Sequence, residues 1–211
     1  MIHQRQALTS RRLDILEAAW RLIAERGYHQ VRIADIAAAC GTSTGTVHYH
    51  FPGKDDVLTE ALHFCVTRAV ERQRVELTAL TDARDRMHRL IDMQLPTDGQ
   101  MREEWSLWLQ FWAEASRRPD LRAAHNHFYE QWQNTVVLIV KRGQRQGTFV
   151  ADVDAATCAL AFTAMVDGLA LKILTGTGLT VPVMRTLLRD FVERELTSPQ
   201  GPLRRGRAKI G

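Results

Sequence analysis

Two short helical segments on either side of a glycine, within residues 33–51, constrain the fold of this chain more than any other feature. Helices that cross at a tight turn need an apolar anchor, a small residue at the crossing, a residue that accepts a positive φ and an apolar residue on the inner face. In that order, these positions hold Ile36, Ala37, Gly41 and Val47. The spacing predicts a helix-turn-helix, although an ordinary pair of short helices would also fit it.

The outer face of the second short helix carries only small or hydrogen-bonding side chains. These residues are Thr44, Gly45, Thr46, His48, Tyr49 and His50. Such a face fits the major groove of DNA, with phosphate contacts on both sides. The two histidines are poor candidates for a shared metal, because residues two apart on a helix point in different directions.

Helical periodicity extends over nearly the whole chain, and no sustained β-type alternation occurs. The fold class that we predict is all-α, with an N-terminal three-helix DNA-binding domain and a C-terminal helical domain. About nine helices are expected, at residues 10–26, 33–40, 44–51, 55–77, 82–94, 102–117, 119–145, 153–175 and 181–196. Glycines punctuate them: Gly27 and Gly41 end two early helices, and Gly143 with Gly147 are expected to end the helix at 119–145.

The charge is uneven along the 211 residues. Residues 1–54 carry a net charge of +3, residues 200–211 carry +4 and the remainder carries −3. The pattern predicts a DNA-binding domain over 1–54, an effector-binding and dimerisation domain over 55–197, and a disordered basic tail over 198–211. The cations of the tail are Arg204, Arg205, Arg207 and Lys209.

Composition excludes several classes of protein. A content of 45% hydrophobic and 25% charged residues does not fit a collagen-like, disordered or disulfide-scaffold chain. Three widely spaced cysteines indicate reduced thiols in a cytoplasmic protein. The N-terminus lacks the apolar stretch of a secretory signal, and the apolar run Ala155–Val166 is too short to cross a membrane. We expect no membrane association, no metal and no cofactor, and the sequence lacks the common enzyme motifs.

A family resemblance follows from these motifs. The pattern G-Y-x-x-V-x-I-x-D-I-A-x-x-x-G-x-S-x-G-T-x-x-Y-H-F-x-x-K, over residues 27–54, resembles the N-terminal domain of the TetR family of bacterial repressors. Residues 105–121 and 162–174 are similar to the ligand-binding half of its BetI-like subgroup. The resemblance implies a homodimeric transcriptional repressor that binds a palindromic operator and is released by a small-molecule effector.

The resemblance also implies roles for single residues. Base contacts are expected from the start of the recognition helix, at Thr44, Gly45 and Thr46. Phosphate or sugar contacts are expected from His48, Tyr49, His50 and Lys54. Arg32 departs from the family pattern, in which a Ser or Thr hydroxyl caps the first short helix, so we expect its side chain to contact phosphate.

The last two predicted helices, 153–175 and 181–196, are the expected dimer interface. Small and apolar residues on them permit close helix approach. The candidates are Ala161, Ala164, Gly168, Leu171, Met184, Leu187, Leu188 and Phe191. The alternative is a monomer in which these faces bury only against each other. A helix-turn-helix protein normally reads two half-sites as a pair, which favours the dimer.

Aromatic residues gather in the middle of the chain and suggest an effector pocket. The candidates are Trp105, Trp108, Trp112, Phe128 and Trp132, with Glu114 or Asp167 as a counter-charge. Indole faces suit an organic cation, which we favour over a neutral apolar effector. The alternatives are an aromatic stripe that is only core, and an Asp167 that makes a structural hydrogen bond across the dimer. An architectural DNA-binding protein without an effector and an all-helical enzyme are the competing functions.

Overall fold

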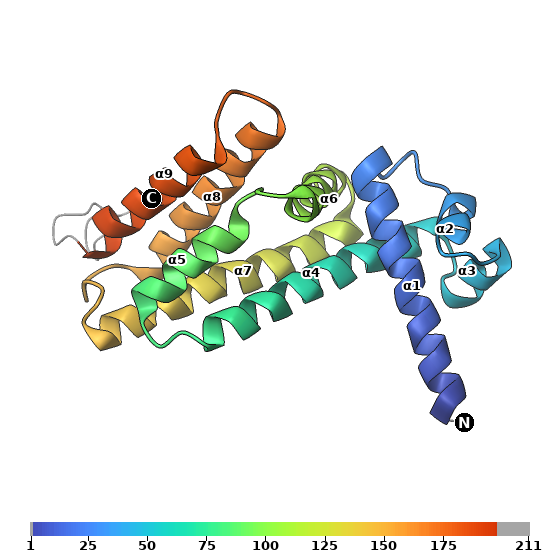
Figure 1. Ribbon diagram of the computed structural model, residues 1–211, viewed down its shortest axis with the longest axis horizontal. Coiled ribbons are helices and arrows are strands. Elements are labelled where there is room, and N and C mark those ends of the chain that lie inside the picture. Colours follow the sequence, from blue (N-terminus) through green and yellow to red (C-terminus); the bar gives the residue numbers. More distant parts are fainter. Residues whose placement is uncertain (1, 198–211) are drawn as a thin grey trace. The chain divides into compact units, whose positions relative to one another are not determined.

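The structure is a computed structural model that describes residues 2–197 (Figure 1). Over these residues it contains nine α-helices and no strand, which confirms the all-α prediction. The helices are α1 (Ile2–Arg26), α2 (Ile33–Ala39), α3 (Thr44–His50), α4 (Lys54–Thr78), α5 (Ala83–Gln94), α6 (Gly99–Ala115), α7 (Pro119–Gln146), α8 (Ala155–Leu174) and α9 (Val181–Val192). The predicted basic tail, 198–211, lies outside the described residues.

The chain forms two compact units that are not continuous in sequence. Among the described residues, unit 1 comprises 2–69 and 103–125, and unit 2 comprises 70–102 and 126–197. Three long helices, α4, α6 and α7, each contribute residues to both units. Most of α6 therefore belongs to the same unit as α1, α2 and α3, whereas the sequence divided the domains at residue 54.

Glycines end the helices where the sequence predicted, with one exception. Gly27, Gly41 and Gly147 adopt φ values of 90°, 60° and 73°, which L-residues with a side chain rarely adopt. Gly143 was expected to help end α7, but it lies inside that helix. A Cβ atom at Gly143 would lie 2.0 Å from the ring of Phe149, which is buried. Gly143 is therefore required for the close approach of this ring.

Helices α8 and α9 contact each other in unit 2 and supply much of its core. The Phe162 ring of α8 lies 6.2 Å from Phe191 of α9 and 6.5 Å from Trp132 of α7. By length and apolarity, α8 could cross a membrane. Its buried residues, which include Phe162 and Val166, pack inside unit 2, and Asp167 interrupts the apolar sequence. One face of α8 therefore packs in the core of unit 2, whereas Leu160 and Leu171 remain exposed.

The predicted last helix, 181–196, changes its winding near its end. The α-helix stops at Val192, and residues Glu193–Thr197 form one π-helical turn. Within that turn Glu195 and Leu196 are buried. The backbone amide of Val150 donates a hydrogen bond of 2.8 Å to the carbonyl of Leu196, so the turn is tied to the segment that follows α7.

Candidate functional site

The inner face of the helix-turn-helix is fully apolar. Ile36 and Val47 are completely buried, and Ala37 is 3% exposed. Gly41 takes the positive φ that the turn between α2 and α3 requires. Helix α2 contacts both α1 and α3, so the recognition helix is supported by a small three-helix core (Figure 1).

Ser43 caps the recognition helix, a role that the sequence analysis overlooked. Its hydroxyl accepts a hydrogen bond of 3.1 Å from the backbone amide of Thr46 and lies 3.0 Å from the Thr46 hydroxyl. A serine directly before an amphipathic segment is a known N-cap signal, so the sequence contained this information. The cap fixes the first turn of α3, from which Thr44 and Gly45 project.

The outer face of α3 is available for binding. Tyr49 is 74% exposed, although it is a large aromatic residue. Thr44, Gly45 and His48 are also exposed, whereas Thr46, His50 and Lys54 are half-buried. The rings of Tyr49 and His50 meet edge to face at 5.2 Å. A single helix therefore presents hydroxyls, imidazoles and a phenol beside a rigid apolar inner face.

Arg32 occupies the N-cap position of α2 without a side-chain cap, as expected. The start of α2 is instead stabilised by a side chain from within the helix. The Asp35 carboxylate accepts a 2.8 Å hydrogen bond from the backbone amide of Arg32. Arg32 is exposed. Its guanidinium is thus not needed for capping.

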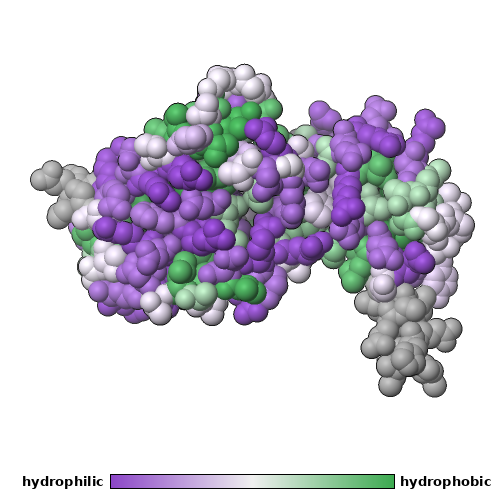
Figure 2. Space-filling model, in the orientation of Figure 1, coloured by the Kyte–Doolittle hydropathy of each residue, from purple (hydrophilic) through white to green (hydrophobic). Residues whose placement is uncertain are grey.

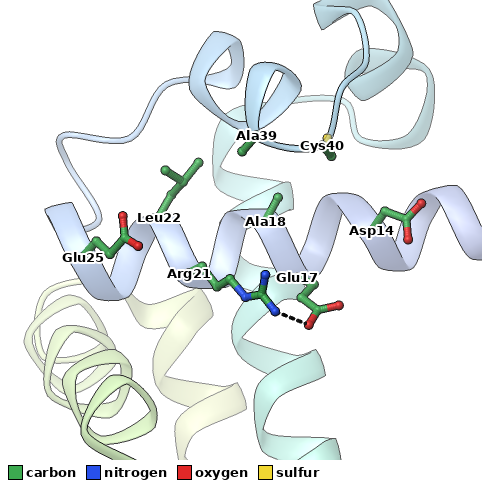
Figure 3. Close-up of a pocket in the computed structure, with 8 residues that line it drawn as sticks. All are labelled: Asp14, Glu17, Ala18, Arg21, Leu22, Glu25, Ala39 and Cys40. Atoms are coloured by element: carbon green, nitrogen blue, oxygen red, sulfur yellow. Dashed lines mark hydrogen bonds and ion pairs between the residues drawn. The ribbon is translucent and has the colours of Figure 1, made fainter. Parts of the chain in front are cut away.

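A groove of about 490 Å³ runs along α1 beside the end of α2 (Figure 3). Three of its lining residues are acidic: Asp14, Glu17 and Glu25. Arg21 donates a 2.9 Å hydrogen bond to Glu17 and so neutralises one of these charges. Arg11 lies 3.7 Å from Asp14 and offsets part of a second charge. Because its lining holds more acids than cations, the groove disfavours phosphate.

The turn between α1 and α2 is held by polar side chains from distant parts of unit 1. Gln110 of α6 accepts a 2.6 Å hydrogen bond from the Tyr28 amide, and its own amide donates to the carbonyl of Ile23 at 2.7 Å. Arg118 donates to the Tyr28 hydroxyl at 2.8 Å, and that hydroxyl donates to Asp55 at 2.8 Å. Burial and the neighbouring Asp55 carboxylate raise the pKa of Tyr28 above its ordinary value.

Glu114 and Lys54 contact the same turn. The Glu114 carboxylate, which is nearly buried, lies 2.9 Å from Nε2 of His29. The Lys54 ammonium donates a 3.2 Å hydrogen bond to the His29 carbonyl and lies 5.9 Å from the Tyr28 ring centroid. We name this set the turn clasp: Gln110, Glu114, Arg118, Lys54 and Asp55 around Tyr28 and His29. Glu114, predicted as a counter-charge for the effector, thus contacts the turn between α1 and α2.

Asp167 is a half-buried carboxylate in unit 2. The Tyr129 hydroxyl of α7 donates a 2.5 Å hydrogen bond to it. Burial raises the pKa of Asp167 to about 6, and the Tyr129 hydrogen bond opposes this shift. Burial, together with the Asp167 hydrogen bond, raises the pKa of Tyr129 to about 12. Asp167 therefore has a hydrogen-bond partner within its own chain.

The predicted effector aromatics are divided between the two units. Trp105, Trp108 and Trp112 lie in unit 1, and Phe128 and Trp132 lie in unit 2. Within the first group, the Trp112 ring lies 6.3 Å from Trp105 and 6.4 Å from Trp108. Trp105 and Phe128 are buried, and Trp108, Trp112 and Trp132 are partly exposed. No group of residues that could hold a metal ion occurs in the described part of the chain.

The predicted dimer residues separate into a buried set and an exposed set, and Ala161 is half-buried. Met184, Leu188 and Phe191 lie in the core of unit 2. Leu171 and Leu187 are 42% and 38% exposed, and Ala164 and Gly168 are exposed beside them. Leu160 and Val183, which are exposed as well, extend this surface. Figure 2 shows hydrophobic residues at the surface near the turn that joins α8 to α9.

Comparison with known proteins places these features in one family. The description "Bacterial regulatory proteins, tetR family" matches residues 15–61, which contain the helix-turn-helix. The description "BetI-type transcriptional repressor, C-terminal" matches residues 83–197, more than half of the chain. This chain belongs to the TetR family. Within it, the C-terminal match makes this member a BetI-like transcriptional regulator, as the sequence motifs indicated.

Relatives of this TetR-family member cover most of its length. A putative transcriptional regulator from Saccharomonospora viridis, solved in complex with choline, is 48% identical over 89% of this chain and 98% of its own, with a TM-score of 0.84. A putative TetR-family regulator from Rhodococcus sp. is 26% identical over 89% of this chain and 99% of its own, with a TM-score of 0.79. The regulator BetI 1 from Chromohalobacter salexigens is 27% identical over 88% of this chain and 90% of its own.

Proposed function

We propose that this protein is a homodimeric repressor that binds a palindromic operator and releases it when a small organic cation binds. The observation that carries the DNA-binding part is the two-sided recognition helix. Its Val47 is completely buried, whereas Tyr49 on the other side is 74% exposed. Thr44 and Gly45 would approach bases, and His48, Tyr49 and Arg32 would contact phosphate or sugar.

Two copies are proposed to pair through the exposed apolar surface of α8 and α9. Ala164, Gly168, Leu171 and Leu187 carry this surface, which a monomer would leave in water. A two-fold pair would place two recognition helices about 34–36 Å apart, one turn of B-DNA. The protein would act in the cytoplasm, where it has access to the nucleoid.

The effector is proposed to be a monovalent organic cation of the choline type. The Saccharomonospora viridis relative holds choline, and its identity to this chain is 48%. In unit 2, the Asp167 carboxylate provides a negative charge in partly dehydrated surroundings. Trp132 presents a partly exposed indole three residues after Tyr129, the hydrogen-bond partner of Asp167, on the same helix. A cation gains about 0.5–2 kcal/mol from each aromatic face and more from a carboxylate of low hydration.

The test joins effector binding to DNA release. A duplex that the protein selects from a random pool should contain two inverted half-sites. Choline chloride should quench or enhance tryptophan fluorescence and release this duplex over the same concentration range. The variant Asp167→Asn should bind choline at least tenfold more weakly and keep its affinity for the duplex. Release by neutral apolar compounds, with no effect of choline or other cations, would contradict the proposal.

A further inference from the structure

We infer that the turn clasp positions the recognition helix, and that Gln110 is its central residue although it belongs to neither DNA-binding nor effector-binding groups. The inference deepens the proposed function and rests on it for the effector response. Gln110 makes two backbone hydrogen bonds, of 2.6 Å and 2.7 Å, to residues on either side of Gly27. It thereby joins the end of α1 to α6.

The turn that the clasp holds is followed closely in sequence by α2, which contacts the recognition helix α3. Tyr28 and His29 precede Arg32, the N-cap of α2, by only a few residues. Helix α2 in turn contacts α3. Because α2 is only seven residues long, it cannot absorb a displacement of the turn by bending. A shift of the turn against α6 therefore changes where Thr44 and Tyr49 point.

The side chains of α6 that concern the clasp and the aromatic stripe project from two different faces of the helix. At 100° per residue, Gln110 and Glu114 project from a face roughly opposite to that of Trp105 and Trp112. The clasp occupies the first face, and the aromatic stripe predicted to respond to effector occupies the second. The part of α6 that lies in unit 1 carries both faces, so a displacement imposed on the aromatic face is transmitted to the α1–α2 turn.

Charge strengthens the clasp around Gln110. Arg118 donates to the Tyr28 hydroxyl and lies 3.4 Å from the Asp55 carboxylate, and Glu114 contacts His29 at 2.9 Å. Hydrogen bonds with a charged partner are stronger than neutral ones. Lys54, predicted to contact phosphate, is held at the same turn by the His29 carbonyl. The clasp therefore also fixes the position from which Lys54 would approach DNA.

The experiment replaces Gln110 by leucine, which keeps the volume and removes both hydrogen bonds. Gln110→Leu should lower affinity for the selected duplex about tenfold, because the competent orientation of the recognition helix becomes a minor fraction of the population. Its affinity for choline, and for random-sequence duplex at low salt, should stay within twofold of wild type. The factor by which saturating choline weakens duplex binding should fall at least fivefold.

Controls separate positioning from loss of fold. Gln131→Leu makes the same change at an exposed site of α7, where only a hydrogen bond to His127 is lost, and should behave as wild type. Glu114→Gln, which retains a hydrogen-bonding group beside His29, should keep operator affinity within about threefold. Arg118→Ala, a truncation of a partly exposed side chain, should reproduce the loss of operator affinity with wild-type melting.

The outcomes distinguish this inference from the proposed function. Wild-type protein that binds choline and keeps its duplex would overturn the proposed effector response, and the operator affinities of the variants would still decide the positioning role. Gln110→Leu and Arg118→Ala with operator affinity within twofold of wild type would overturn the clasp. Equal losses for selected and random duplex would also overturn it, since the clasp acts on orientation rather than on charge.

Discussion

At the scale of single residues, the ionisation of Asp167 makes the stability of the folded protein depend on pH. Its pKa is about 6 in the fold and near 4 in an unfolded chain, so the folded state holds the proton more tightly. Its contribution favours folding at low pH and is lost as pH rises from about 4 to 6, a loss of about 2–3 kcal/mol. Asp167→Asn has no proton to lose here, so its free energy of unfolding should not fall as the pH rises from about 4 to 6. Relative to wild type, the variant should therefore become more stable over that range. Urea titrations measure this difference.

The same carboxyl gives the effector response an opposite dependence on pH. A cation binds the ionised form, so choline affinity should fall by up to tenfold for each pH unit below about 6. Isothermal titration from pH 5 to 7.5 measures this slope. A choline affinity that does not vary across that range would show that Asp167 does not face the cation.

Gly143 is the residue for which added volume should cost most. Its Cβ would lie 2.0 Å from the buried Phe149 ring, which has no exposed flexible end to move aside. Gly143→Ala should therefore destabilise the protein by about 1–3 kcal/mol, despite the better helix propensity of alanine. Gly99→Ala, where nothing lies within 4 Å, should leave the melting temperature unchanged or raise it.

At the scale of elements, helix α3 should separate affinity from specificity. Tyr49 is exposed beyond the part of the helix that would face the bases, so Tyr49→Ala should weaken binding to all duplexes by a similar factor of about ten. Thr44→Ala should instead change which base pairs are accepted near one end of each half-site. Selection of duplexes by each variant, followed by titration, checks both. A changed base preference in Tyr49→Ala would mean that α3 sits in the groove differently.

How far the sequence predicts an element depends on how local its cause is. Ile36, Gly41 and Val47 were identified correctly because each requirement of the turn lies within a few residues of the next. The Gln110–Tyr28 contact joins positions 82 residues apart, and no periodicity reports such a pairing. The contact between Glu114 and His29 was unpredictable for the same reason, since an acid on an aromatic-rich helix gives no sign of which face meets His29.

Gly143 shows a related limit. A glycine near a helix end and a glycine under a packed ring look alike in sequence, and only the position of Phe149 distinguishes them. For α3, the buried inner face at Val47 and the exposed side chain of Tyr49 were predictable from spacing. The burial of Met184, Leu188 and Phe191 inside unit 2 was not, because an apolar stripe can face either its own core or a second copy.

At the scale of the whole molecule, the exposed surface of α8 and α9 should determine assembly. Leu187→Glu would place a charge in the proposed interface, where an unpaired ion costs several kcal/mol. We expect a monomer that retains its helical content and loses operator affinity by more than a hundredfold. Leu138→Glu, at a 66% exposed position of α7, should remain dimeric. Sedimentation velocity decides, and a dimer that survives Leu187→Glu would place the interface elsewhere.

The two-segment composition of unit 1 has a consequence for protein engineering. Sensors with new specificities are often built by joining the DNA-binding domain of one regulator to the effector-binding domain of another at a single junction. Here unit 1 takes residues 103–125 as well as 2–69, and Gln110 bonds the turn beside Tyr28. A chimera cut once after the helix-turn-helix would combine a turn from one parent with an α6 from another. A transplanted DNA-binding domain should keep its sequence preference only when both segments come from the same donor.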